Sequence, residues 1–183
     1  MGAHAQASVV TLTLGVSLSV AAAAHTAPAE LATSYKLIDG GGAFTCAVTT
    51  GGSAKSWGQG FMGQLGDGAG ADRSQPVTVA GLSSGVGTIA AGDSHACAVT
   101  TSGAVYCWGS YTSGQLGNGT TSTRYAPVLV AGLGGKAKSV TAGYQHTCAV
   151  LTTGIARCWG WNFWGQLGTG STQSTRVPTT AKG

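Results

Sequence analysis

The feature that most constrains this chain is a repeat with a constant step of 51 residues. Cys46, Cys97 and Cys148 are separated by this step twice (97 − 46 and 148 − 97). The same step relates Trp57, Trp108 and Trp159, then Pro76, Pro127 and Pro178, and then three Gly-Gln-Leu-Gly copies that begin at Gly63, Gly114 and Gly165. A period of about 50 residues is typical of propeller blades or large solenoid units. The chain is therefore expected to fold as stacked copies of one unit.

Each unit has the pattern of short β-strands. The middle copy contains four β-favouring or alternating segments, divided by glycines, at 88–91, 96–100, 104–108 and 127–130. Thr101-Ser102-Gly103 joins the second segment to the third as a tight loop with glycine where a positive φ is expected. No segment has a helical period over a useful length. We predict an all-β repeat protein with repeats at 35–85, 86–136 and 137–183, the last one truncated or capping.

Composition narrows the class of partner. Charged residues make up 8% of the chain, against about 25% in an average protein. The net charge of +4 rests on nine Lys and Arg residues that are spread singly, without a stripe that could follow a phosphate backbone. The sequence therefore predicts no nucleic-acid partner.

The N-terminal residues differ from the repeats. The chain is apolar or small from Val9 to Ala24, and both Ala22-Ala23-Ala24 and Ala27-Pro28-Ala29 resemble signal-peptide cleavage sites. We predict a signal peptide over 1–29, a secreted or periplasmic protein, and no membrane span after processing. The segment 1–8 departs from the signal-peptide pattern because it lacks Lys and Arg, and a disordered or mis-started N-terminal tail is the alternative interpretation.

Three motifs recur in order and carry a family resemblance. In the middle copy they are 91–99 (Ala-Gly-Asp-Ser-His-Ala-Cys-Ala-Val), 105–109 (Val-Tyr-Cys-Trp-Gly) and 114–117 (Gly-Gln-Leu-Gly). They resemble the repeat of the regulator of chromosome condensation (RCC1-like) family, and the resemblance covers 36–183. Members usually form seven-bladed β-propellers, so the resemblance implies a partial or assembled β-propeller with about three four-stranded blades. The chain is then a fragment, an assembly with other copies, or an open stack.

The spacing of the cysteines favours disulfides across two β-hairpins. Two pairs, Cys97 with Cys107 and Cys148 with Cys158, are each symmetric about a predicted hairpin tip. Antiparallel pairing puts such residues directly opposite each other, within the span of a disulfide. Cys46 faces Ser56 and is left free or paired elsewhere. We predict two disulfides and an oxidising compartment. The alternative is five buried thiols, and a zinc site is disfavoured because no Cys-x-x-Cys is present.

Neither histidines nor carboxylates indicate catalysis. His95 and His146 occupy a position that is Phe44 in the first copy, so the position accepts an apolar ring. We predict that both histidines are structural and hydrogen-bonded inside their own blades. No carboxylate pair, phosphate loop or nucleophile elbow is present in the sequence. The sequence predicts no enzyme, no catalytic residue, no metal ligand and no cofactor.

The copies differ most between the repeated Trp-Gly and Gly-Gln-Leu-Gly, at 59–62, 110–113 and 161–164. A constant scaffold with a variable insert is typical of binding loops, and large aromatic side chains often supply hot-spot energy. The candidate binding residues are Phe61, Tyr111, Trp161, Phe163 and Trp164. Stacking on sugar rings or bases would use the same residues, and packing between blades is the structural alternative.

The function predicted first is an extracellular module for protein–protein interaction, inhibitor-like as in some secreted bacterial members of the family. A guanine-nucleotide exchange factor-like regulator of a small GTPase and a carbohydrate-binding scaffold are the alternatives. The partner is an unknown protein, and a homo-oligomer is expected if blades are shared between chains. Fold alone does not choose among these functions.

Overall fold

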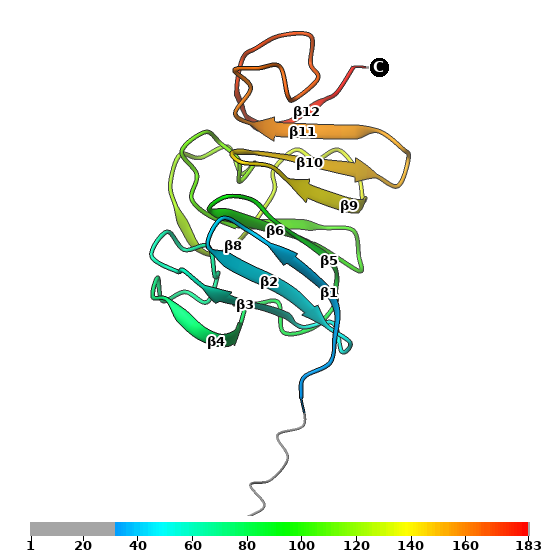
Figure 1. The fold of residues 1–183 in the computed structure, drawn as a ribbon. Helices are drawn as coiled ribbons and strands as arrows, with labels where there is room; N and C mark the ends of the chain where they lie inside the picture. Colours follow the sequence, from blue (N-terminus) through cyan, green and yellow to red (C-terminus); the bar gives the residue numbers. More distant parts are fainter. Residues whose placement is uncertain (1–31, 183) are drawn as a thin grey trace, which may run out of the picture. The chain divides into compact units, whose positions relative to one another are not determined.

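The computed structural model describes residues 32–182, which form three four-stranded antiparallel sheets and no helix (Figure 1). The predicted signal peptide over 1–29 lies outside the described residues. Blade 1 contains β1 (Tyr35–Gly40), β2 (Phe44–Thr49), β3 (Ala54–Gly58) and β4 (Arg73–Thr78). Blade 2 contains β5 (Val86–Ala91), β6 (His95–Thr100), β7 (Val105–Gly109) and β8 (Arg124–Leu129). Blade 3 contains β9 (Ala137–Ala142), β10 (His146–Leu151), β11 (Ala156–Gly160) and β12 (Thr175–Thr180).

Strands pair in chain order within each sheet, as a meander of hairpins. The fourth strand of the middle copy differs from the prediction of 127–130, because it begins three residues earlier, at Arg124. A register shift explains the difference: Cys107 opposes Val128, whereas Gly109, two residues on, opposes Arg124. This shift brings residues before Pro127 into the ladder, and alternation of residue types did not show it.

The sheets follow one another as blades. β1 contacts β5, and β5 contacts β9, so the first strands of the three blades lie together. The fourth strand of each blade lies at the opposite edge of its sheet. This is the arrangement of propeller blades around an axis, and it confirms the predicted all-β class.

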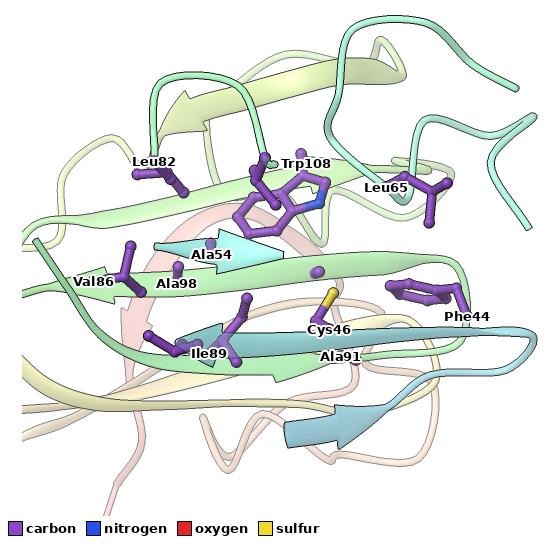
Figure 2. Close-up of a cluster of buried hydrophobic side chains, with 13 residues drawn as sticks. Phe44, Cys46, Ala54, Leu65, Leu82, Val86, Ile89, Ala91, Ala98 and Trp108 are labelled. Atoms are coloured by element: carbon purple, nitrogen blue, oxygen red, sulfur yellow. The ribbon is translucent and has the colours of Figure 1, made fainter. Parts of the chain in front are cut away.

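The hydrophobic cores lie between the blades. The first core joins blade 1 to blade 2, and the indole of Trp108 lies between Leu65 and Leu82 (Figure 2). The second core joins blade 2 to blade 3, with Trp159 in the equivalent position. Both indoles have 0% exposure. Each blade therefore depends on its neighbour to bury its apolar face.

The Gly-Gln-Leu-Gly segments form sockets for these indoles. Trp108 Nε1 donates to the Gln64 carbonyl oxygen at 2.9 Å, and Trp159 Nε1 donates to that of Gln115 at 2.9 Å. Gly66 has a φ of +66°, and an added Cβ there would lie 2.7 Å from the Trp108 ring. A larger residue is excluded both by the ring and by the backbone conformation. We call 63–66, 114–117 and 165–168 the socket loops.

Candidate interaction surface

The variable loops precede the socket loops and share one backbone scaffold. In every blade the socket glutamine accepts, on Oε1, a hydrogen bond from the backbone N–H two residues before it. The pairs are Met62 with Gln64 at 2.9 Å, Ser113 with Gln115 at 2.8 Å and Trp164 with Gln166 at 3.0 Å. The repeated glutamine thus holds the loop while the side chains before it vary.

In blade 3 the loop is also held from inside by Asn162, which has 0% exposure. Its Nδ2 donates to the carbonyl oxygens of Ser171 and Gln173 at 2.8 and 3.0 Å, and its Oδ1 accepts from the Leu167 N–H at 2.9 Å. Asn162 is not among the residues that the sequence pattern indicated. The repeat gave no signal for it, because the equivalent positions are Gly60 and Tyr111.

Three aromatic side chains of this loop form what we call the aromatic cluster: Trp161, Phe163 and Trp164. The rings of Trp161 and Phe163 are stacked, with centroids 6.3 Å apart and an angle of 9°. Phe163 and Trp164 meet edge to face at 4.8 Å. Phe163 is 62% exposed and Trp164 is 77% exposed. The cluster is therefore an apolar surface that the described residues leave uncovered, with rings that hold one another in place.

The candidates in the other two blades are not part of this cluster. Phe61 is 53% exposed in the variable loop of blade 1, and its carbonyl oxygen accepts a 3.4 Å hydrogen bond from the Tyr125 hydroxyl. Tyr111 packs against the core between blades 2 and 3. Tyr111 therefore packs between blades, as the structural alternative predicts, whereas the side chain of Phe61 is exposed to solvent.

The histidine of blade 2 connects two blades. The Thr147 hydroxyl donates to the Gln115 carbonyl oxygen at 2.9 Å, and His95 Nε2 lies 2.9 Å from the same hydroxyl oxygen. Since that hydroxyl proton is used, His95 must donate, which places its proton on Nε2. The prediction that the histidines bond inside their own blades is wrong for His95. Its side chain lies on the sheet face that meets blade 3, so its partner comes from there.

Burial keeps His95 neutral. Desolvation lowers the pKa of His95 to about 3, with a smaller contribution from the nearby His146. Desolvation also lowers the pKa of His146. A neutral, fully buried imidazole that donates to a hydroxyl serves packing, and within residues 32–182 no carboxylate hydrogen-bonds to it.

The cysteines of blades 2 and 3 lie at disulfide distance. Cys97 and Cys107 directly oppose each other with Cα atoms 4.1 Å apart, and Cys148 and Cys158 do the same at 4.1 Å. Cys46 is free and buried, and desolvation raises the pKa of its thiol to about 12. That thiol is inert at neutral pH.

The described residues include neither a metal-binding group nor a membrane-spanning helix. Across 32–182, no group of three or more His, Cys, Asp or Glu side chains is placed to hold a metal ion. Over the same residues, no helix has the length and apolar character to cross a membrane.

This geometry defines a class of protein: β-propeller blades in which a tryptophan of one blade enters the socket loop of the blade before it. The regulator of chromosome condensation (RCC1) repeat model matches residues 52–99, 102–150 and 158–183, and a second model of the same repeat matches 88–115 and 137–166. The chain belongs to the RCC1 repeat family.

The similar proteins are much longer than this chain. The human E3 ubiquitin-protein ligase HERC2 is 40% identical over 65% of this chain and 2% of its own length. The ultraviolet-B receptor UVR8 of Arabidopsis thaliana is 35% identical over 74% of this chain and 31% of its own length. This chain thus spans less than a third of these relatives.

Solved structures of related proteins have the same fold. Yeast RCC1 (Prp20), crystallised bound to Kap60, has a TM-score of 0.70 and 27% identity over 81% of this chain and 37% of its own. Human WBSCR16 has a TM-score of 0.71 and 25% identity over 80% of this chain and 37% of its own. The three blades correspond to a part of these larger proteins.

Proposed function

We propose that this chain is an extracellular protein-binding module whose contact surface is the aromatic cluster of blade 3. The observation that carries the proposal is the exposure of Phe163 and Trp164 on a loop whose backbone is held by Asn162 and Gln166. Rigid aromatic side chains bury a large area at a low cost in conformational entropy, which is why Trp and Tyr dominate interface hot spots.

Support for an extracellular site of action comes from the two cysteine pairs, because disulfides persist in oxidising compartments. Support for a protein partner comes from a related fold, since yeast Prp20p has been crystallised with Kap60 and its binding to Gsp1p and histones has been described. By covering a functional surface of its partner, such a module acts as an inhibitor.

The test is a triple variant, Trp161→Ala/Phe163→Ala/Trp164→Ala. The wild-type chain, immobilised in its oxidised form, should retain a protein from the extracellular fluid of its source. The triple variant should lose this binding by about 30-fold or more for each hot-spot residue, which corresponds to about 2 kcal/mol. Its melting temperature should stay near that of the wild type, because two of the three rings are exposed.

Ile155→Ala is the matched control, since Ile155 is a 43% exposed apolar residue in the β10–β11 turn of the same blade. It should bind like the wild type. A triple variant that melts early yet still binds through its folded fraction contradicts the proposal. Retention of a glycan on an array, without any protein partner, would instead favour the carbohydrate-binding alternative.

A further inference from the structure

The two outer faces of the described blade stack have no partner blade within residues 32–182. We call the outer face of blade 1 the leading face; it carries Ile38, Thr45 and Trp57. We call the outer face of blade 3 the trailing face; it carries Val150 and the socket loop 165–168. The two internal interfaces show what these faces are built to contact, because each joins a trailing face to the leading face of the next blade.

Side chains on the leading face are exposed where their equivalents are buried. Ile38 is 67% exposed, whereas Ile89, one repeat further on, is 6% exposed. Trp57 is half-buried, whereas Trp108 and Trp159 have 0% exposure. Tyr35 covers the Trp57 ring only in part, with centroids 6.2 Å apart. The leading face therefore presents an indole that has no socket.

The trailing face presents a socket that has no indole. Gln64 and Gln115, the socket glutamines of the internal interfaces, are 0% and 1% exposed, whereas Gln166 is half-buried. A Cβ added at Gly114 would lie 2.9 Å from Arg176 of the next blade, but one at Gly165 has nothing within 4 Å. The loop keeps its socket conformation nonetheless, since Trp164 and Gln166 make the same hydrogen bond as their equivalents.

The polar residues of the two outer faces also match. At the internal interface between blades 2 and 3, the trailing face offers His95 and the leading face offers the Thr147 hydroxyl, 2.9 Å apart. The equivalent pair between blades 1 and 2 is apolar, with Phe44 and Ala96 in one core. The unpartnered trailing face carries His146, and the unpartnered leading face carries Thr45. Histidine is again matched by threonine.

We propose that the trailing face of blade 3 binds the leading face of blade 1 of a second copy of this chain. In this interface Trp57 enters the socket loop 165–168 and donates to the Gln166 carbonyl oxygen, while the Thr45 hydroxyl accepts from His146. The leading face of the second copy also covers Val150, which is half-buried here although the equivalent Val48 and Val99 are 0% and 2% exposed. Such a contact is heterologous, so repetition produces a ring or an open filament.

The experiment uses one blocking variant for each face. Ile38→Arg places a charge on the leading face, and Val150→Arg places one on the trailing face. In sedimentation velocity, the average mass of the wild-type chain should rise with concentration. Each variant alone should lose self-association by at least about 30-fold. An equimolar mixture should form a 1:1 complex, because each variant keeps one intact face, and the double variant should form no complex with either single variant.

Leu129→Arg is the control, because Leu129 is a 56% exposed apolar residue on the outermost strand of the middle blade. It should associate like the wild type. Should Val150→Arg lower the melting temperature, Ala181→Arg on the same face replaces it, since Ala181 is half-buried where Val79 and Val130 are buried.

Two outcomes overturn the proposal: a wild-type chain that is monomeric at every concentration, and variants that associate as the wild type does. The inference does not rest on the proposed function, and the blocking residues lie outside the aromatic cluster. Capture of an external partner by Ile38→Arg therefore tests the proposed function separately.

Discussion

The interface between blades 1 and 2 and the interface between blades 2 and 3 use the same socket with different surroundings. Both receive an indole that donates to a socket carbonyl oxygen at 2.9 Å. Around Trp108 the neighbours include Phe44 and the free thiol of Cys46. Around Trp159 they include the Cys97–Cys107 pair, and His95 bonds to Thr147 across the interface.

The difference teaches that the socket carries the blade-to-blade packing, while the position beside it is exchangeable. An apolar pair and a hydrogen-bonded histidine–threonine pair occupy equivalent places in the two interfaces. The two sides of each interface have to match in polarity, because an unpaired buried polar group costs about 1 to 3 kcal/mol.

The largest effect is expected from Trp108→Ala, which empties the socket between blades 1 and 2. Deleting a large buried aromatic side chain costs about 3 to 5 kcal/mol of unfolding free energy. Trp57→Ala is the matched control, because Trp57 is half-buried on the leading face and should cost less when the chain is monomeric. Denaturant unfolding of both variants measures the difference between their losses of unfolding free energy. Equal losses would show that the socket is not the main source of packing energy.

The next largest effect is expected from removal of one hairpin disulfide by Cys97→Ala/Cys107→Ala. Loop-closure entropy for a separation of 10 residues gives a loss of about 3 kcal/mol in unfolding free energy. Blade 1 has no equivalent disulfide, because Cys46 is free. The double variant therefore removes a stabilising bond that is present at the interface between blades 2 and 3 and that blade 1 does not supply to the interface between blades 1 and 2. In the wild type, alkylation without reduction should label one cysteine, Cys46, and only after unfolding. Five reactive thiols would contradict the pairing.

Lowering the pH should destabilise the chain through the interface between blades 2 and 3, because His95 is buried there. The pKa of His95 is about 3 in the folded chain against 6.5 for the free side chain, so the unfolded chain binds the proton more readily. The stability that this neutral histidine contributes is present above pH 6.5 and is lost as the pH falls towards 3. Between pH 7 and pH 5 the loss is about 2 kcal/mol. In denaturant titrations from pH 7 to pH 5, His95→Phe should remove most of the loss of unfolding free energy and leave the smaller contribution of His146, whose pKa is also lowered. An unchanged profile of unfolding free energy against pH would contradict the role of His95.

The smallest effect tests the match itself, by converting one interface into the other. Thr147→Ala leaves the His95 N–H without its acceptor, whereas His95→Phe/Thr147→Ala recreates the Phe44 and Ala96 pair of the neighbouring interface. The double variant should therefore be more stable than the sum of the two single changes predicts, by about 1 kcal/mol. Urea titrations of the four proteins give this coupling energy. Additive effects would show that the two interfaces are not interchangeable.

Much of the fold could be predicted because it is local in sequence. The hairpin between β6 and β7 places Cys97 opposite Cys107, the register that symmetry about Ser102 predicts. Strand positions in the middle copy also agree with the pattern, apart from the fourth strand and its register shift. Membership in the repeat family could be predicted from the sequence, because the motifs recur at a constant step of 51 residues.

Parts of the candidate surface were less predictable. The aromatic residues of blade 3 were visible because the loop varies between copies, yet the pattern could not separate the exposed Phe163 from the packed Tyr111. The difference depends on what covers each loop, and blade 3 covers Tyr111. Asn162 was missed because its hydrogen bonds go to loop backbone atoms, which sequence patterns do not describe.

By itself the sequence determined the unit, because its motifs recur at a step of 51 residues. It also determined the strands and hairpin pairings, because these depend on residues that lie close together in the chain. Only the tertiary structure decided what each repeated residue does. The indole of Trp108 bonds to a carbonyl 44 residues away, and His95 bonds to a threonine 52 residues away, in both cases across a boundary between blades. A repeat shows that such positions are equivalent, but the partner is set by the packing of one blade on the next.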